Sequence, residues 1–456
     1  MHRVSDHLED RYPYRSGFRE ENNENDVSRA YGSQDIARYC RLLSLKEELT
    51  DEDRVKALTG LVDLLANQEN KTKAVAAGVV ASMSRLMTVS NHDIRLGAAT
   101  VVAAIAWDAD GLVAMDKDPT LMFNLNSLLF DANPACIEMA TQVLVNLTTN
   151  REGIPIVLAR SYIREKLVAM ATGADTTLTT ATIVHLYQIF AQLTKSQLGA
   201  QACAEVHVVP ALIRILHNPL LFPAKLLRHV VQTVWNLATH NEGKVEAISL
   251  NVVELLIKVL TGAQKHVFSS LGRDAELDLI RITSGALMAL ATAEVAKPKL
   301  LATGIDPLVA CLFVSASRQN AIQALNYMCE ERSGLLSVVT LLLDHPASLL
   351  VEVFGVRAMP ALNTLLEQEL KPTPIVLQAI ADVCTEEGGV DQITQCLHML
   401  DNLTKLCEVN TDIPRVPELA TGILKAVAEH DDKARGRVER ALERNKVAPA
   451  FVKSIL

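Results

Sequence analysis

Four polar side chains lie at the same register of a repeated phrase in the 456-residue chain: Asn146, Gln192, Asn236 and Tyr327. The phrase reads "VLVNLTTNREG", "IFAQLTKSQLG" and "VWNLATHNEG" around the first three of them. A carboxamide donates and accepts hydrogen bonds together, so a row of such groups can pair with both polar groups of a peptide bond. We call this register the amide position, and it predicts a protein-binding row at these four residues.

The row of amides is interrupted in three copies, by Ala104, Ala289 and Tyr327, and it also has a structural interpretation. Buried carboxamides in proteins are normally hydrogen-bonded, so these groups can instead tie each repeat to its neighbour. The sequence leaves both interpretations open.

Apolar residues surround the amide position in every copy. Two places before it and one place after it the chain has Val102, Leu144, Phe190, Val234, Leu287, Leu325 and Ile105, Leu147, Leu193, Leu237, Leu290, Met328. A spacing of three between apolar positions forms one stripe of an α-helix. The amide position is therefore predicted to lie on a helix whose apolar stripe faces a core.

A glycine seven residues after the amide position marks the repeat period. Lining up Gly111, Gly153, Gly199 and Gly243 gives steps of 42, 46 and 44 residues; two further steps of 53 and 38 reach Ala296 and Gly334. We interpret this residue as the end of the phrase. Between the copies, shorter apolar segments such as "VVPALIRIL" begin near glycine or proline, as helices do.

A period of about 40 to 47 residues that holds two or three helices is typical of armadillo and HEAT repeats. Such units cannot bury their apolar faces alone, so neighbours must stack. The predicted fold is an all-α, armadillo/HEAT-like, right-handed superhelical solenoid. The armadillo form fits better, because a short helix, a longer helix and a final amide-bearing helix recur in that order.

The chain is predicted to have four parts. Residues 1–34 form an extended N-terminal arm, 35–70 lead-in helices, 71–334 the armadillo repeat array, and 335–456 divergent helical repeats with a C-terminal cap. Residues 261–276 are predicted to be a polar insertion between helices at the edge of the array. The last helix carries seven Lys or Arg residues, which we interpret as a solvated face in preference to a specific site for an acidic partner.

Composition and motifs restrict the function classes. The net charge of −9 argues against nucleic-acid binding, and no apolar run reaches the roughly 18 charge-free residues of a membrane span. The first residues are too polar for a secretory signal, and eight cysteines without a CxxC motif indicate buried reduced thiols, so we expect a cytoplasmic location. P-loop, GxGxxG, GxSxG and HExxH motifs are absent, so we expect no enzyme activity, catalytic residue, metal, cofactor or small-molecule substrate.

Three stretches resemble the radial-spoke armadillo protein family of motile cilia: "VKALTGLVDLLANQENKTKAVAAGVVASMSRLM", "SGALMALATAEVAKPKLLATGIDPLVACL" and "NAIQALNYMCEE". They span the array from about 50 to 334. The resemblance implies a non-enzymatic structural scaffold in the ciliary or flagellar axoneme, which holds radial-spoke or other axonemal subunits. The longer N-terminal arm, the insertion at 261–276 and the extended C-terminal region depart from the family.

In armadillo solenoids generally, the last helix of each unit lines a concave groove where asparagines hold extended peptides. The resemblance therefore implies an alternative function, a cytosolic adaptor or chaperone cofactor that uses such a groove. Nuclear-import receptors of this class also carry a tryptophan one turn before each groove asparagine. Here Trp235 directly precedes Asn236, which rotates it by about 100° and argues against a nuclear-signal groove.

Overall fold

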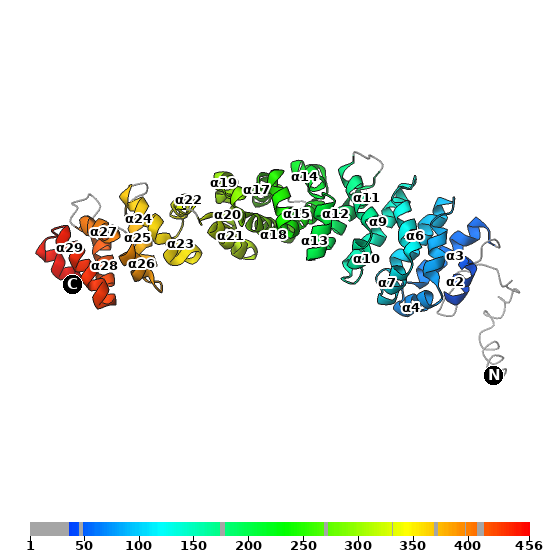
Figure 1. Ribbon diagram of the computed structural model, residues 1–456, viewed down its shortest axis with the longest axis horizontal. Helices are drawn as coiled ribbons and strands as arrows, with labels where there is room; N and C mark the ends of the chain where they lie inside the picture. Colours follow the sequence, from blue (N-terminus) through cyan, green and yellow to red (C-terminus); the bar gives the residue numbers. More distant parts are fainter. Residues whose placement is uncertain are drawn as a thin grey trace, which may run out of the picture. The chain divides into compact units, whose positions relative to one another are not determined.

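The computed structural model describes residues 36–44, 49–173, 178–268, 272–330, 332–368, 373–396, 398–407 and 415–456. The predicted arm at 1–34 lies outside these residues. The chain divides into two compact units, Met1–Ala211 and Leu212–Leu456. All regular structure in the described residues is helical (Figure 1). The predicted all-α fold is confirmed.

The first unit is built from three-helix repeats that follow a lead-in pair. Its helices are α2 (Ile36–Ser44), α3 (Asp51–Leu64), α4 (Gln68–Ala76), α5 (Val79–Leu86), α6 (His92–Ile105), α7 (Ala109–Lys117), α8 (Pro119–Leu128), α9 (Pro134–Thr149), α10 (Ile154–Leu158), α11 (Ser161–Thr172), α12 (Thr180–Leu193) and α13 (Gln197–Glu205). We call α6, α9 and α12 third helices, since each ends a repeat; α3 takes the same place in the lead-in pair. Consecutive ones pack against each other from α3 to α12, with α3, α6 and α9 side by side in Figure 1.

The second unit continues the three-helix pattern. The unit boundary falls within α14 (Val209–His217), after which come η3 (Pro219–Leu221), α15 (Ala224–Ala238), α16 (Asn241–Ser249), α17 (Val252–Gln264), α18 (Arg273–Ala291), η5 (Glu294–Ala296), α19 (Lys297–Thr303), α20 (Ile305–Cys311) and α21 (Ser315–Met328). Third helices α15, α18 and α21 pack in that order. The predicted stacking of third helices in chain order therefore holds within each unit.

Helices also fill the region predicted to be divergent repeats and a cap. They are α22 (Arg332–Leu342), α23 (Ala347–Phe354), η6 (Gly355–Ala358), α24 (Met359–Glu367), α25 (Thr373–Cys384), α26 (Gly389–Gln395), α27 (Met399–Cys407), α28 (Arg415–His430), α29 (Asp432–Arg444) and α30 (Pro449–Ile455). Helix α25 packs against α28. Helix α23 contacts both α21 and α25, so the stack of the second unit continues from α21 through α23 and α25 to α28.

The third helices of the first unit begin with side-chain caps. Asn91, Asn133 and Thr179 accept hydrogen bonds from backbone N–H groups at the start of α6, α9 and α12, at 2.9, 2.9 and 3.1 Å. Such caps satisfy donors that have no partner inside the helix, and each stabilises a helix by about 1 kcal/mol. The bidentate pair between Arg95 of α6 and Asp131, at 2.7 and 2.8 Å, ties the beginning of one repeat to the next.

The structure corrects the interpretation of the repeated glycine. It does not end the amide-bearing helix; Gly111, Gly199 and Gly243 lie in the first turn of the following helix. A Cβ on Gly199 would come within 1.9 Å of the Leu193 carbonyl oxygen, and one on Gly153 within 2.1 Å of the Leu147 oxygen. The glycine is required because the next repeat starts against the last turn of the preceding third helix.

Other copies accommodate the close approach between a third helix and the start of the next repeat in different ways. At the equivalent position of the first repeat, Asn70 donates a hydrogen bond from Nδ2 to the Leu64 carbonyl at 2.9 Å. Gly389 extends the glycine series into the C-terminal region, where a Cβ would meet the Val383 oxygen at 2.0 Å. In the copy that carries Ala296, the 3-10 helix η5 replaces the first α-helical turn.

The bounds predicted for the polar insertion, 261–276, are wrong at both ends. Helix α17 continues to Gln264, and α18 begins at Arg273. The polar residues in "TGAQ" and "RDAEL" obscured two helical segments: Ala263 in the first is fully buried, and Ala275 and Leu277 in the second are partly buried. The segment that links the helices is therefore about half as long as predicted.

Among the residues that the structure describes, one helical stretch, Leu349–Glu367, is long and apolar enough to cross a membrane by length and composition, and up to three qualify if bent helix pairs are counted. It contains Glu352 and Arg357, so the prediction about charge-free runs holds. In the structure 61% of this window is buried inside the protein. The backbone also changes direction at Gly355, which has φ of +51° and begins η6 directly after α23. The apolar residues of this stretch thus contribute to the helical core.

Candidate functional site

Asn146 lies on α9 and is only 4% exposed. Its Nδ2 donates to the Ala103 carbonyl in the last turn of α6 at 2.8 Å, and its Oδ1 accepts from Gln142 Nε2 at 2.7 Å. Carbonyls in the last turn of a helix have no partner within that helix. Asn146 therefore caps the preceding third helix and fastens two repeats together.

Gln192 occupies the same position on α12 and is 9% exposed. Its Nε2 donates to the Thr149 hydroxyl at 2.8 Å, and its Oε1 accepts from the Thr148 hydroxyl at 2.5 Å. Both threonines belong to α9, so the carboxamide spans the interface between consecutive third helices. Asn146 and Gln192 thus make the bonds that the structural interpretation of the row requires, while peptide binding by either residue stays a prediction.

The other two predicted residues belong to the second unit. Asn236 on α15 is partly exposed and accepts a hydrogen bond from Gln232 Nε2 at 2.9 Å. Tyr327 on α21 is also partly exposed, and helix α18 lies between the two, packed against both α15 and α21. The structure therefore brings Asn146 and Gln192 onto adjacent helices and separates Asn236 from Tyr327 by one helix.

A second row, which the sequence analysis missed, runs one turn before the amide position. It contains glutamine in five copies: Gln142, Gln188, Gln232, Gln323 and Gln378. Gln142 and Gln188 lie at the same register on α9 and α12, and each is partly exposed. Gln142 holds Asn146, whereas the Gln188 carboxamide has no hydrogen-bond partner among the described residues. The spacing of four residues before the amide position was the signal for this row.

Trp235 on α15 packs against α18, the next third helix of the second unit. A Cβ on Gly285 of α18 would come within 2.6 Å of the Trp235 indole, so glycine replaces glutamine in this copy of the second row. The guanidinium carbon of Arg281 lies 5.7 Å from the centre of the tryptophan ring, within the range of a cation–π contact. Trp235 therefore has a packing partner in the chain itself.

The cysteine thiols of the chain are free and mostly buried. Six of the eight cysteines are buried, and all eight are free. Burial raises the pKa of the Cys203 thiol to about 12 and that of Cys40 to about 11, which removes the nucleophilic thiolate at neutral pH. Among the described residues, no group of three or more His, Cys, Asp or Glu side chains could hold a metal ion.

Asn146→Ala should lower the free energy of unfolding by about 1–2 kcal/mol, because it leaves the Ala103 carbonyl without its donor. Urea unfolding of the full chain measures the change. Gln201→Ala is the matched control, since Gln201 is exposed on α13 of the same unit and should change stability by less than about 0.5 kcal/mol. Equal effects of the two substitutions would show that the inter-repeat bond contributes nothing.

No family model and no curated protein matches the chain. Among solved structures, the chain is similar to an engineered protein over 92% of its own length and 97% of that chain, with 18% identity and a TM-score of 0.58. A computationally designed armadillo repeat protein for modular peptide recognition covers 56% of this chain and 99% of its own, with 17% identity and a TM-score of 0.47. Another designed armadillo repeat protein has 18% identity and a TM-score of 0.47.

The first of these similarities concerns the fold alone, and it agrees with the three-helix repeats described above. The chain is an all-α, armadillo-like solenoid.

Proposed function

We propose that this chain is a non-enzymatic scaffold that binds segments of other proteins along the third helices of its first unit. The observation that supports this proposal most directly concerns Gln188 on α12: its carboxamide is partly exposed and has no hydrogen-bond partner among the described residues. Gln142 lies one repeat earlier at the same register, on the helix that packs against α12. The Gln188 carboxamide, together with the oxygen and the second N–H of Gln142, can pair with the N–H and C=O groups of an extended peptide.

Asn146 and Gln192, the two predicted residues of this unit, hold the partly exposed Gln142 and Gln188 in place. Asn146 accepts from Gln142, and so fixes the direction of the Gln142 carboxamide, while Asn146 itself is held by the carbonyl of Ala103. Gln192 fastens α12, which carries Gln188, to the threonines of α9. A peptide-binding surface gains affinity when its polar groups are held in place before binding, because less side-chain freedom is lost.

Gln188→Ala should weaken capture of a bound partner roughly fivefold, which corresponds to the loss of about one net hydrogen bond. Immobilised full-length chain and quantitative mass spectrometry of captured proteins measure the change, with Gln201→Ala as the matched control. Asn146→Ala is unsuitable here, because it also breaks the bond between α6 and α9. Unchanged capture by the Gln188 variant would remove this surface from consideration.

For the assembly, we infer an axonemal scaffold that holds subunits of a radial spoke in cilia or flagella. Its support is the resemblance of the stretches at 55–87, 284–312 and 320–331 to that family. Fractionation of flagellated cells tests it: the protein should remain with the salt-resistant axoneme. Recovery in the detergent-soluble fraction alone would reject the spoke assignment and favour the alternative, a cytosolic adaptor or chaperone cofactor, to which Gln188 would contribute in the same way.

A further inference from the structure

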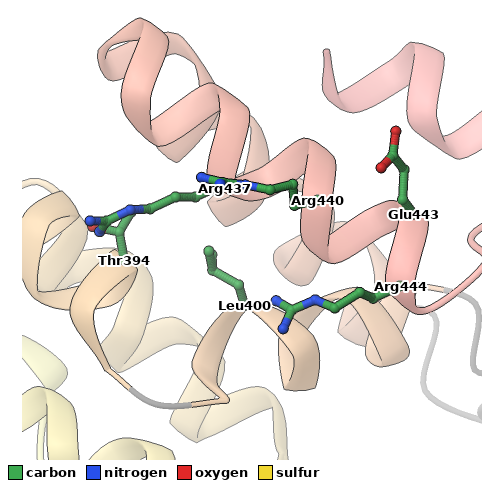
Figure 2. Close-up of a pocket in the computed structure, with 6 residues that line it drawn as sticks. All are labelled: Thr394, Leu400, Arg437, Arg440, Glu443 and Arg444. Carbon is green, nitrogen blue, oxygen red and sulfur yellow. The ribbon is translucent and has the colours of Figure 1, made fainter.

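A cavity lined by arginines lies in the C-terminal region of the second unit. It has a volume of about 440 Å³ and lies between α26, α27 and α29, where its lining residues are Thr394, Leu400, Arg437, Arg440, Glu443 and Arg444. Figure 2 shows the three arginine side chains extending from α29 to the same side, around Leu400. The volume is within the range of sites that bind small ligands or a few side chains of a partner.

The three arginines form one narrow row on α29. Positions 437, 440 and 444 fall within about 60° of each other around the helix axis, and Lys433 begins the same row one turn earlier. Like charges at such spacing repel and destabilise a helix, so an ordinary solvated face alternates charges instead. The other side of α29 does so, because Arg435 pairs with Glu439 at 3.7 Å.

Two of the three guanidinium groups are not neutralised. Arg440 Nε donates to the Gly436 carbonyl of its own helix, and neither Arg437 nor Arg440 makes an ion pair within the described residues. Arg444 pairs with Asp401 of α27 at 3.0 Å. Arg444 is thus neutralised by a carboxylate outside the cavity lining, and Arg437 and Arg440 together with one lining carboxylate, Glu443, leave the cavity with positive charge in excess.

The floor of the cavity is apolar. Leu400 of α27 is 8% exposed and lies among the arginine side chains in Figure 2, and Thr394 of α26 adds a hydroxyl. A guanidinium binds a carboxylate through two parallel hydrogen bonds, and an apolar floor takes an apolar side chain. The combination fits a short segment that carries acidic residues on both sides of an apolar one.

We propose that this cavity binds an acidic peptide segment of a partner protein, with carboxylates on Arg437 and Arg440 and an apolar side chain against Leu400. A nucleic acid is the poorer match, since the chain carries a net charge of −9 and Glu443 lies at the same cavity. This site is on α29 in the second unit, so it is independent of the proposed binding surface on α9 and α12.

Fluorescence polarisation with the full-length chain tests the proposal. The probe is a labelled peptide in which Glu and Asp flank one Leu, between Gly-Ser ends. The double variant Arg437→Glu, Arg440→Glu should bind this probe at least about tenfold more weakly, because both carboxylate partners become repulsive. The control double variant Lys225→Glu, Lys258→Glu changes the net charge equally at exposed positions of the same unit and should keep the affinity within twofold.

Two further measurements separate charge from fold and from other ligands. Arg437→Lys with Arg440→Lys keeps the charge but loses the paired geometry, so it should bind several-fold more weakly while unfolding like the unaltered chain. Probes with Gln for Glu, or Ala for Leu, should also bind more weakly. The proposal is overturned if the acidic probe does not bind at millimolar concentration, if the lysine control lowers affinity equally, or if only a phosphoserine peptide or an RNA oligonucleotide binds.

Discussion

Leu237→Ala is expected to lower the free energy of unfolding by about 2–5 kcal/mol, as truncation of a buried leucine does. Leu237 follows the amide position on α15 and is 1% exposed, so its removal leaves a cavity against the start of the next repeat at Gly243. Repeats are stabilised by their neighbours, so hydrogen exchange should also accelerate in α18, which packs against α15. Urea unfolding gives the energy, and exchange mass spectrometry gives its distribution.

The control for this substitution is Leu221→Ala in the same unit. Leu221 is 77% exposed, so its truncation should change stability by less than about 0.5 kcal/mol. If Leu237→Ala behaved like the control, the apolar stripe would not face the core, and the predicted helical register would be incorrect.

Gly199→Ala is expected to cost about 3 kcal/mol, the upper part of the range for overpacked sites. The added Cβ would lie 1.9 Å from the carbonyl oxygen of Leu193 and 2.8 Å from its carbonyl carbon. Both are backbone atoms, so relief requires α13 to move away from the end of α12. The shift in the urea midpoint measures this cost.

Gly422→Ala is the matched control, because Gly422 lies inside α28 with nothing within 4 Å of its added Cβ. Alanine favours helix over glycine, so this variant should gain about 0.5–1 kcal/mol. If Gly199→Ala destabilises the chain while Gly422→Ala stabilises it, the close approach between repeats determines the effect of the added methyl group on stability. A stabilising Gly199→Ala would mean that the first turn of α13 adopts a 3-10 form at no cost, as η5 does at Ala296.

The helices and their stacking could be predicted because apolar spacing reports which face of a helix is buried. The stripe at Leu147, Leu193 and Leu237 is buried as that spacing indicates, at 1% exposure or less. The role of the repeated glycine could not be predicted from spacing, since a glycine after a helix is equally compatible with ending it or with beginning the next. Only the approach of the next helix to a carbonyl distinguishes the two, and that is a tertiary contact.

The sequence predicted the helical register of the candidate site residues, but it did not predict which of them are exposed to solvent. The sequence places Asn146 and Gln192 on one face of equivalent helices, which is what the structure has. Burial then depends on how closely consecutive third helices approach, so the amide position lies in the interface while Gln188, one turn earlier, remains partly exposed. The arginine cavity depends on α26, α27 and α29 meeting, which the run of basic residues alone did not indicate.

Position-specific photo-crosslinking tests the central claim, that the third helices of the first unit are the surface that holds partners. A photoreactive phenylalanine derivative is placed either at Gln188 on α12 or at Val113, which is 51% exposed on α7 of the same unit. The account predicts that partner proteins are crosslinked from position 188 and not from position 113. Crosslinks from position 113 alone would contradict it, because partners would then bind at α7, the first helix of its repeat, and not at the glutamines of the third helices.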